Sequence, residues 1–145
     1  MSRLEVDLAL SRRMVAAALD RAAQLGALVS AAVVDAGGHL VAFERMDGAE
    51  IAGPVLAPDK AFTAVAHRLA THELAELVVP GGPLNGMQAA AGGRYVCFAG
   101  GLPLWSEGRV VGGVGVSGGS AEEDLACASA ASEVFTGHRG EGGAA

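Results

Sequence analysis

The sequence predicts one α+β domain, built on a five-stranded, mainly antiparallel sheet with helices packed against it. Apolar residues recur at helical spacing near the N-terminus, and a capping signal opens another helix near the C-terminus. Between them lie short apolar runs separated by glycine-rich turns, and strands that are joined by short turns must be antiparallel. The 145 residues suffice for one domain with a sizeable core and contain no internal repeat.

The first elements are an amphipathic helix and a β-hairpin. Apolar positions place the helix over residues 4–25, and Gly26 ends it at the C′ position. Apolar runs over residues 28–34 and 39–43 then flank a tight reversal that contains two glycines. Asp35 can hydrogen-bond the amides two residues on, and glycine tolerates the positive φ that such a reversal needs. These features are typical of a hairpin with a short loop.

Two helical pieces and a surface excursion follow the hairpin. After a loop over residues 50–58, Pro58 suits the first turn of a helix over residues 59–69. A second helical piece covers residues 71–78 and ends before a stretch rich in proline and glycine. Glycines recur through residues 80–93, so we expect this segment to make an excursion over the surface.

Three strands come next. They are predicted over residues 95–98, 102–106 and 109–117, and Glu107-Gly108 forms the two-residue turn between the last two. The last of these strands contains three glycines, at Gly112, Gly113 and Gly115. Because glycine has no side chain, its presence inside a strand implies that another element packs closely against the backbone there.

A capped helix closes the domain. Ser120 and Glu123 form a capping box, and the acidic first turn that follows suits the positive end of a helix dipole. The helix is predicted over residues 121–135. The element order is therefore α-β-β-α-α-β-β-β-α, with one domain over residues 1–137 and a flexible, glycine-rich tail over residues 138–145.

Composition disfavours several classes of partner. The formal net charge is −6 with only ten lysines and arginines, which argues against nucleic acid and anionic membrane surfaces. The chain contains no run of about 18 apolar residues that would span a membrane, and its acidic N-terminus does not resemble a secretory signal, so we expect a cytoplasmic protein. Cys97 and Cys127 are too few for a disulfide scaffold and lack metal-ligand spacing, which favours buried free thiols.

A polar stripe runs along the helix after the hairpin. Its members are spaced i, i+3, i+7 and i+11 and share one face of a straight helix: Lys60, Thr63, His67 and Thr71. The stripe is either a solvated face, with Thr71 capping the next helical piece, or the lining of a pocket for an anionic ligand or a haem edge. No metal site is predicted, because His67 and His72 lie about 140° apart on a helix.

A charged rim and two amide-rich loops are the other candidates. Glu44, Arg45 and Asp47 end the second strand of the hairpin, either as a surface salt-bridge cluster or as catalytic groups. Backbone amides around Gly101 and over residues 117–119 suit an anion, the latter at a helix N-terminus. Neither loop matches a nucleotide-binding motif.

Five motifs, taken in order, resemble the GlcG/HbpS family, which includes the C-terminal domain of PduO-type proteins. They are VVDAGGHL (33–40), RMDGA (45–49), KAFTA (60–64), GGLPL (100–104) and GGVGVSGG (112–119) with Asp124. The resemblance implies a profilin-like fold and homo-oligomers, as dimers, tetramers or octamers. Some family members bind haem through a threonine after the lysine-bearing helix, which corresponds to Thr71, and His67 offers an axial ligand.

Three functions follow from these residues and the resemblance. The first is a haem- or small-ligand-binding oligomer, with Lys60, His67 and Thr71 lining the site. The second is a cofactor-independent isomerase or lyase acting on a small carboxylated or carbonyl metabolite, with Glu44 or His67 as its base. Lys60 or Arg45 would be its electrostatic partner. The third is an assembly module whose glycines serve only packing.

The predicted site depends on one arrangement of the fold. The sheet has to bring the Asp35 turn, the Arg45 rim and the lysine-bearing helix into a shared neighbourhood. The ligand-binding residues are then Asp35, Thr63, Thr71, Gly101, Ser117 and Gly118, beside the catalytic candidates Lys60, Glu44, His67 and Arg45. Haem is the cofactor that the resemblance implies.

Overall fold

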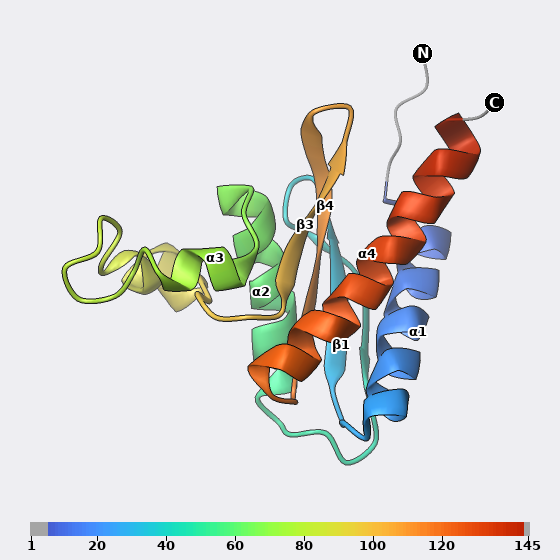
Figure 1. The fold of residues 1–145 in the computed structure, drawn as a ribbon, viewed down its shortest axis with the longest axis horizontal. Helices are drawn as coiled ribbons and strands as arrows, with labels where there is room; N and C mark the ends of the chain where they lie inside the picture. The colour runs from blue at the N-terminus through green and yellow to red at the C-terminus, as the bar shows by residue number, and fades with distance from the viewer. Residues whose placement is uncertain (1–5, 144–145) are drawn as a thin grey trace.

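Within residues 6–143, which the computed structural model describes, four strands form one antiparallel sheet (Figure 1). All neighbouring pairs of strands are antiparallel, which confirms the predicted α+β class. The spatial order is β2-β1-β4-β3. The strands are β1 (Ser30–Asp35), β2 (Leu40–Arg45), β3 (Gly101–Ser106) and β4 (Arg109–Ser117).

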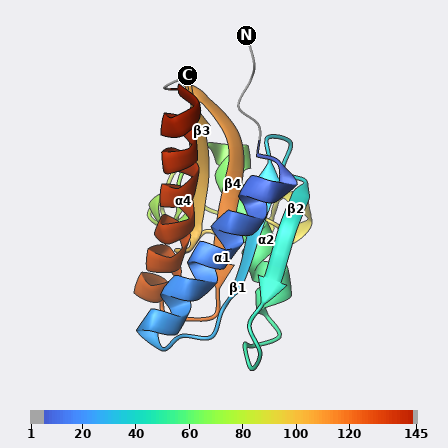
Figure 2. The ribbon, with the colours of Figure 1, turned by 90° about the vertical axis from the view of Figure 1, so that its right-hand side faces the viewer.

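Helices cover both faces of the sheet (Figure 2). α1 (Leu8–Leu25) and α4 (Ala121–Gly143) lie together on one face, and α2 (Gly53–His67) lies on the other. The main hydrophobic core fills the space between the α1/α4 layer and the sheet. Its buried members come from both helices and from the central strands, and they include Met14, Val33, Val114 and Phe135.

A long excursion leaves the body of the domain between α2 and β3 (Figure 1). It contains the short helix α3 (Thr71–Ala75) and the 3-10 turns η1 (Met87–Ala89) and η2 (Ala91–Gly93). Most of the residues from 79 to 94 are exposed, which confirms the surface excursion predicted from the glycines.

The predicted strand over residues 95–98 is wrong, and the sheet has four strands among the described residues instead of five. This segment lies against α2, where the Val96 amide donates to Thr63 Oγ1 over 2.9 Å. Because that amide bonds a helix side chain, it is not available to the ladder of a neighbouring strand. The order of helices and strands is therefore α-β-β-α-α-β-β-α.

α2 begins earlier than predicted. It starts at Gly53, inside the predicted loop, because Pro54 occupies its first turn. Pro58 then lies inside the helix, where it has no amide to donate to the Pro54 carbonyl four residues back. A proline therefore occupies the first turn of this helix, as predicted, but it is Pro54 and not the predicted Pro58.

α4 begins as predicted and ends later. Ser120 Oγ accepts from the Glu123 amide over 3.1 Å, and Glu123 Oε1 accepts from the Ser120 amide over 2.9 Å, which completes the capping box. The helix continues past residue 135 to Gly143, into the predicted tail, of which residues 144–145 lie outside the described part. No helix of the described chain is long and apolar enough to cross a membrane.

Both predicted hairpin turns are present. Asp35 Oδ1 accepts hydrogen bonds from the amides of Gly37 and His39, each over 2.9 Å. In the second hairpin, Glu107 and Gly108 have φ values of 52° and 76°, and positive φ at both central residues defines a type I′ turn. Each turn sets the register within its own hairpin, and the two hairpins join through the pairing of β1 with β4 at the centre of the sheet.

α2 lies directly on the glycines of β4, as their bare backbone predicts. A Cβ on Gly113 would come within 2.7 Å of the Ala61 carbonyl oxygen, and a Cβ on Gly115 would collide with the Ala57 carbonyl. The helix backbone can therefore approach the strand more closely than any other residue type would allow. This contact determines where the side chain of Lys60 is directed.

Candidate functional site

Lys60 and Asp124 form an ion pair inside the domain. Lys60 Nζ lies 3.1 Å from Asp124 Oδ2 and donates to the Val116 carbonyl over 2.9 Å. Only 1% of the Lys60 side chain and 6% of the Asp124 side chain are exposed. Lys60 Nζ also lies 5.0 Å from the centre of the Phe98 ring, a cation–π distance. Charged side chains are rarely buried to this extent unless they are paired.

Burial opposes the charge on both members of the pair. It lowers the pKa of Lys60 below its ordinary value, although the nearby Asp124 carboxylate acts in the opposite direction. It raises the pKa of Asp124, while Lys60 and the amides of Gly119 and Gly118 partly counteract this rise. Both shifts favour the neutral forms, as expected when loss of hydration outweighs the attraction between two charges.

Two glycine-rich loops enclose the ion pair. The Gly119 amide donates to Asp124 Oδ1 over 2.8 Å, and the Gly118 amide also donates to this carboxylate. Gly100 has a φ of 127°, and a Cβ there would lie 2.9 Å from Lys60 Nζ. The sequence predicts that the amides of residues 118–119 bind an external anion. In the structure they bind the carboxylate of Asp124 instead.

Three of the four residues of the predicted polar stripe are buried and His67 is partly buried, so the interpretation as a solvated face is wrong. Thr63 and Thr71 have no exposed surface. Thr63 Oγ1 accepts from the Val96 amide and Thr71 Oγ1 accepts from the Gly101 amide, each over 2.9 Å. The two hydroxyls thus attach the segment that leads into β3. α2 ends at His67, and Thr71 is the first residue of α3 instead of its cap.

His67 ends this stripe in an aromatic cluster. The His67 and Tyr95 rings meet edge to face, with centroids 4.6 Å apart. Tyr95 stacks on Phe62 at 5.8 Å, and the Arg94 guanidinium lies 3.7 Å from the centre of the Phe62 ring. His67 Nε2 is buried and has no hydrogen-bond partner among the described residues. Such an imidazole nitrogen can still accept a hydrogen bond or bind a metal.

The charged rim of β2 does not join the ion pair. Glu44, Arg45 and Asp47 are exposed. Arg45 pairs across the ladder with Ser30, which packs against Gly53 of α2, whereas Glu44 pairs with Ala31 of the core under α1. Because direct cross-strand partners share a face, Glu44 and Arg45 point to opposite faces of the sheet. The structure therefore separates Glu44 from Arg45 among the residues predicted as catalytic.

The predicted shared neighbourhood is divided between the two ends of the sheet. Ser117 is buried next to the ion pair. Across the sheet, Ser117 pairs with Ser30 of β1, and Ser30 pairs with Arg45 of β2. Asp35 pairs with Gly112 at the other end of β1, about 17 Å away at the usual rise of a strand. Burial raises the pKa of Asp35, but the amides of His39 and Gly37, together with the His39 side chain, bring it below its ordinary value. The Asp35 carboxylate therefore stabilises the β1–β2 turn.

The two cysteines are free thiols outside the ion pair. Cys127 is buried in the core, and burial raises the pKa of its thiol to about 11. Burial also raises the pKa of Cys97, which is partly buried. Thiols with raised pKa values are poor nucleophiles at neutral pH. Within the described chain, no three His, Cys, Asp or Glu residues are grouped to hold a metal ion.

Sequence reasoning does not single out Asp124 or Tyr95 as site residues. Asp124 stands in an acidic first turn that a helix dipole already explains, which conceals its role as a partner. A usable signal is that Lys60 is the chain's single lysine, on a helix that is mostly apolar. If it is buried it needs a carboxylate, and an acidic turn after a glycine-rich loop supplies one.

The burial of Lys60 predicts low chemical reactivity of its amine. Because the chain has a single lysine, acylation of this amine can be followed by digestion and mass spectrometry. We expect Lys60 to stay unmodified in the folded protein under conditions that modify it fully in denaturant. Comparable modification in both states would contradict the burial of Nζ.

Known proteins share this sequence over most of its length. The family described as "Haem degrading protein HbpS-like" matches residues 6–133. The corrinoid adenosyltransferase PduO of Salmonella typhimurium is 44% identical over 113 residues, which are 78% of this chain and 34% of PduO. The chain thus spans about a third of the length of this relative.

Solved structures share the fold. Protein ORFY of Klebsiella pneumoniae superposes with a TM-score of 0.89 at 34% identity, covering 94% of each chain. The structure of a PduOC–haem complex superposes with a TM-score of 0.87 at 40% identity, covering 90% of this chain and 95% of that one. The arrangement of helices and strands described above is therefore that of a characterised fold.

Proposed function

The chain belongs to the HbpS-like family, and from this premise we propose that it binds haem, with His67 as an axial ligand. The similarity to PduOC, which has been crystallised with haem, supports the ligand. One observation on this chain carries the proposal: His67 Nε2 is buried without a hydrogen-bond partner among the described residues. Histidine nitrogen is the commonest protein ligand of haem iron.

The surroundings of His67 fit a haem. The rings of Tyr95 and Phe62 provide flat apolar surface. The Arg94 guanidinium beside them pairs with Asp59 through Nε over 3.1 Å, and its terminal nitrogens would be the donors to a propionate. A bound haem would supply an iron that takes axial ligands from the protein. Because Nε2 is buried and the Tyr95 ring packs against the imidazole, the surroundings of His67 have to open before Nε2 can reach an iron. Tyr95 is attached to α2 through its neighbour Val96, which bonds Thr63.

Lys60 and Thr71 have different roles in this proposal from those that the sequence predicts. Lys60 is 1% exposed and paired with Asp124, and Thr71 is fully buried with its hydroxyl on the Gly101 amide. We therefore propose that both residues hold α2 and β3 in place and that neither touches haem. The isomerase or lyase alternative gains no support, because Glu44 lies on the opposite face of the sheet from Arg45 and the amine of Lys60 is already paired with Asp124.

A haem titration with two histidine variants tests this function. We expect saturable binding, seen as a shift of the Soret band, that His67→Ala weakens at least about tenfold because the iron loses a ligand. His72→Ala is the matched control, since His72 is exposed on α3 and should leave the titration unchanged. Absence of a shift, or an unchanged shift in His67→Ala, would refute the proposal.

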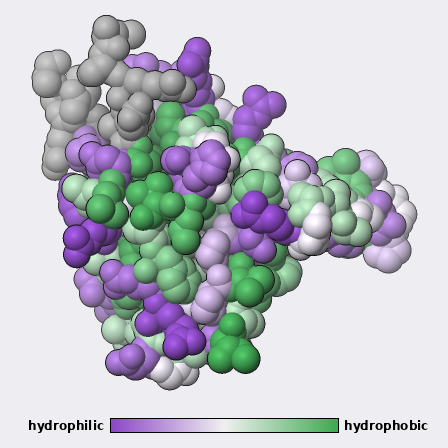
Figure 3. Space-filling view, turned by 180° about the vertical axis from the view of Figure 1, so that it is seen from behind, coloured by the Kyte–Doolittle hydropathy of each residue, from purple (hydrophilic) through white to green (hydrophobic). Residues whose placement is uncertain are grey.

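Self-association as a dimer, tetramer or octamer stays a prediction from the family resemblance. The excursion supports it, because it projects from the body as an arm with apolar and polar side chains interspersed (Figure 3). Val79 and Leu84 on this arm are 47% and 38% exposed. Apolar side chains on a projecting segment are typical of surfaces that contact another chain.

A further inference from the structure

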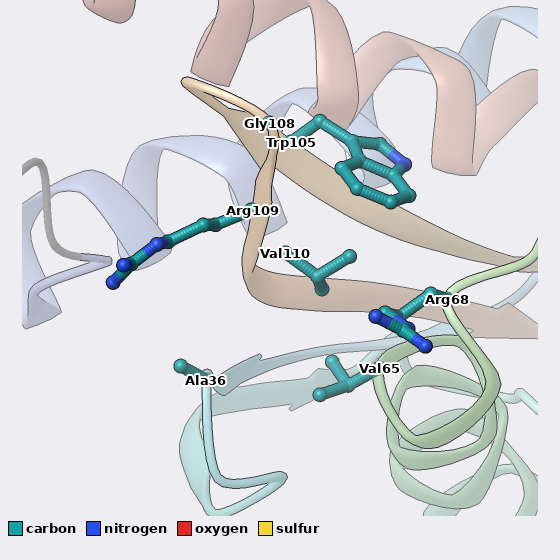
Figure 4. A pocket seen from close by; sticks show the side chains of 7 residues that line it. All are labelled: Ala36, Val65, Arg68, Trp105, Gly108, Arg109 and Val110. Carbon is teal, nitrogen blue, oxygen red and sulfur yellow. The ribbon is translucent and has the colours of Figure 1, made fainter.

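A second candidate site lies at the opposite end of the sheet from the ion pair. A cavity of about 320 Å³ opens there between the C-terminal end of α2, the β1–β2 turn and the β3–β4 hairpin (Figure 4). Figure 4 shows Arg68 and Trp105 on one side of the cavity and Arg109 and Ala36 on the other, with the Arg109 side chain extending away from Arg68. Val65 and Val110 provide apolar lining. None of these residues takes part in the site proposed for haem.

Three unusual features of the backbone position the side chains of Arg68, Arg109 and Trp105 around the cavity. Arg68 ends α2 in the left-handed conformation, with a φ of 54°, which is uncommon for a residue with a side chain. The type I′ turn at Glu107-Gly108 positions Arg109, and a register shift between Leu104 and Trp105 redirects the strand just before the indole. Bulges and strained residues occur preferentially beside functional sites.

The cavity is positively charged in an acidic protein. Within the described residues, neither Arg68 nor Arg109 forms an ion pair, although the chain carries a net charge of −6. The C-terminal end of α2 adds a dipole equivalent to about half a negative charge, which two guanidinium groups outweigh. The carboxylate of Asp35, beside Ala36, is bonded to the amides of its own turn. Two cations therefore remain available to an anion.

We propose that this cavity binds a small organic anion with a flat apolar body, such as an aromatic carboxylate. The guanidinium group of Arg68 binds the carboxylate, since planar guanidinium matches its geometry, and Arg109 adds positive charge on the other side of the cavity. The indole of Trp105, which is 44% exposed, and the two valines contact the ring. A volume of about 320 Å³ is at the small end for ligand pockets, so it suits a single ring.

Trp105 provides the signal for the test, because it is the only tryptophan of the chain. The indole is excited at a wavelength longer than those that the added compound absorbs. Its fluorescence is followed during titration with millimolar phthalate and, separately, with uncharged benzamide. We expect a saturable change with phthalate that weakens with added salt, and a much smaller one with benzamide. Absence of a saturable change with phthalate, or equal binding of benzamide, would overturn the proposal.

Three arginine variants test the assignment of residues. We expect Arg68→Gly to weaken phthalate binding about tenfold, because the carboxylate loses its direct partner, and Arg109→Gln to weaken it by a smaller factor, because only a nearby charge is lost. Arg68→Gly suits the left-handed backbone at this position, so loss of folding does not explain its effect. Arg13→Gln removes the same charge from the exposed surface of α1 and should leave binding unchanged. Equal weakening by Arg13→Gln, or none by the two cavity variants, would overturn it.

Discussion

Replacing Lys60 with methionine is expected to lower the free energy of unfolding by about 3–5 kcal/mol. Methionine fills a similar volume but leaves the Asp124 carboxylate buried without its cation and the Val116 carbonyl without its donor. Domains of this size are usually stable by about 5–15 kcal/mol, so the variant would retain only part of its stability. Urea denaturation followed by circular dichroism measures the difference.

A double-mutant cycle distinguishes the ion pair from simple loss of packing. Asp124→Leu alone should also be strongly destabilising, because it leaves the Lys60 ammonium buried and unpaired. Combined with Lys60→Met it should restore about 1–3 kcal/mol relative to the sum of the single variants, since no unpaired charge remains. Additive losses would contradict a direct interaction between these two residues.

Acid should reduce the deficit of the Lys60→Met variant. Burial raises the folded pKa of Asp124 above its unfolded value, and removing Lys60 takes away a group that lowers it. A carboxyl with a raised folded pKa stabilises the fold below its unfolded pKa, and this contribution is lost as pH rises through the folded value. The variant should therefore be closer to the parent protein at pH 5 than at pH 7. An equal deficit at both pH values would contradict this account.

Local signals predict most of the fold. The two hairpin turns and the capping box at Ser120 each depend on residues within four positions of one another, and all three are present. The same holds for the C-cap Gly26, which has a φ of 72°. The glycines of β4 predict a close neighbour, although only the structure shows that this neighbour is α2. For the turns and the caps, the determining interaction lies within one short stretch of sequence.

Contacts between distant residues account for what the sequence does not predict. Residues 95–98 have the composition of a strand, but the Val96 amide bonds Thr63, 33 positions earlier. The partner of Lys60 lies 64 positions away. Helical spacing places Lys60, Thr63 and Thr71 on one stripe without showing that the stripe is buried. Burial of polar groups depends on partners that other segments supply, and those appear only when the chain is folded.

Gly115→Ala is expected to destabilise the domain by about 3 kcal/mol or more, the upper range for overpacking. The added methyl group would collide with the Ala57 carbonyl and come within 2.7 Å of the Ala61 amide nitrogen, both of which are helix backbone. Backbone cannot rotate away as a side chain does, so α2 has to shift as a unit. Thermal denaturation measures the loss.

Gly137→Ala is the matched control. This glycine lies in α4 with open space around its Cβ position, so alanine should stabilise the helix by up to about 1 kcal/mol. Because α2 carries Lys60, the shift caused by Gly115→Ala should also expose Nζ to acylation in the folded protein, whereas Gly137→Ala should leave it protected. A Gly115→Ala variant with unchanged stability and a protected lysine would mean that α2 does not rest on β4, and the buried ion pair would then have no structural basis.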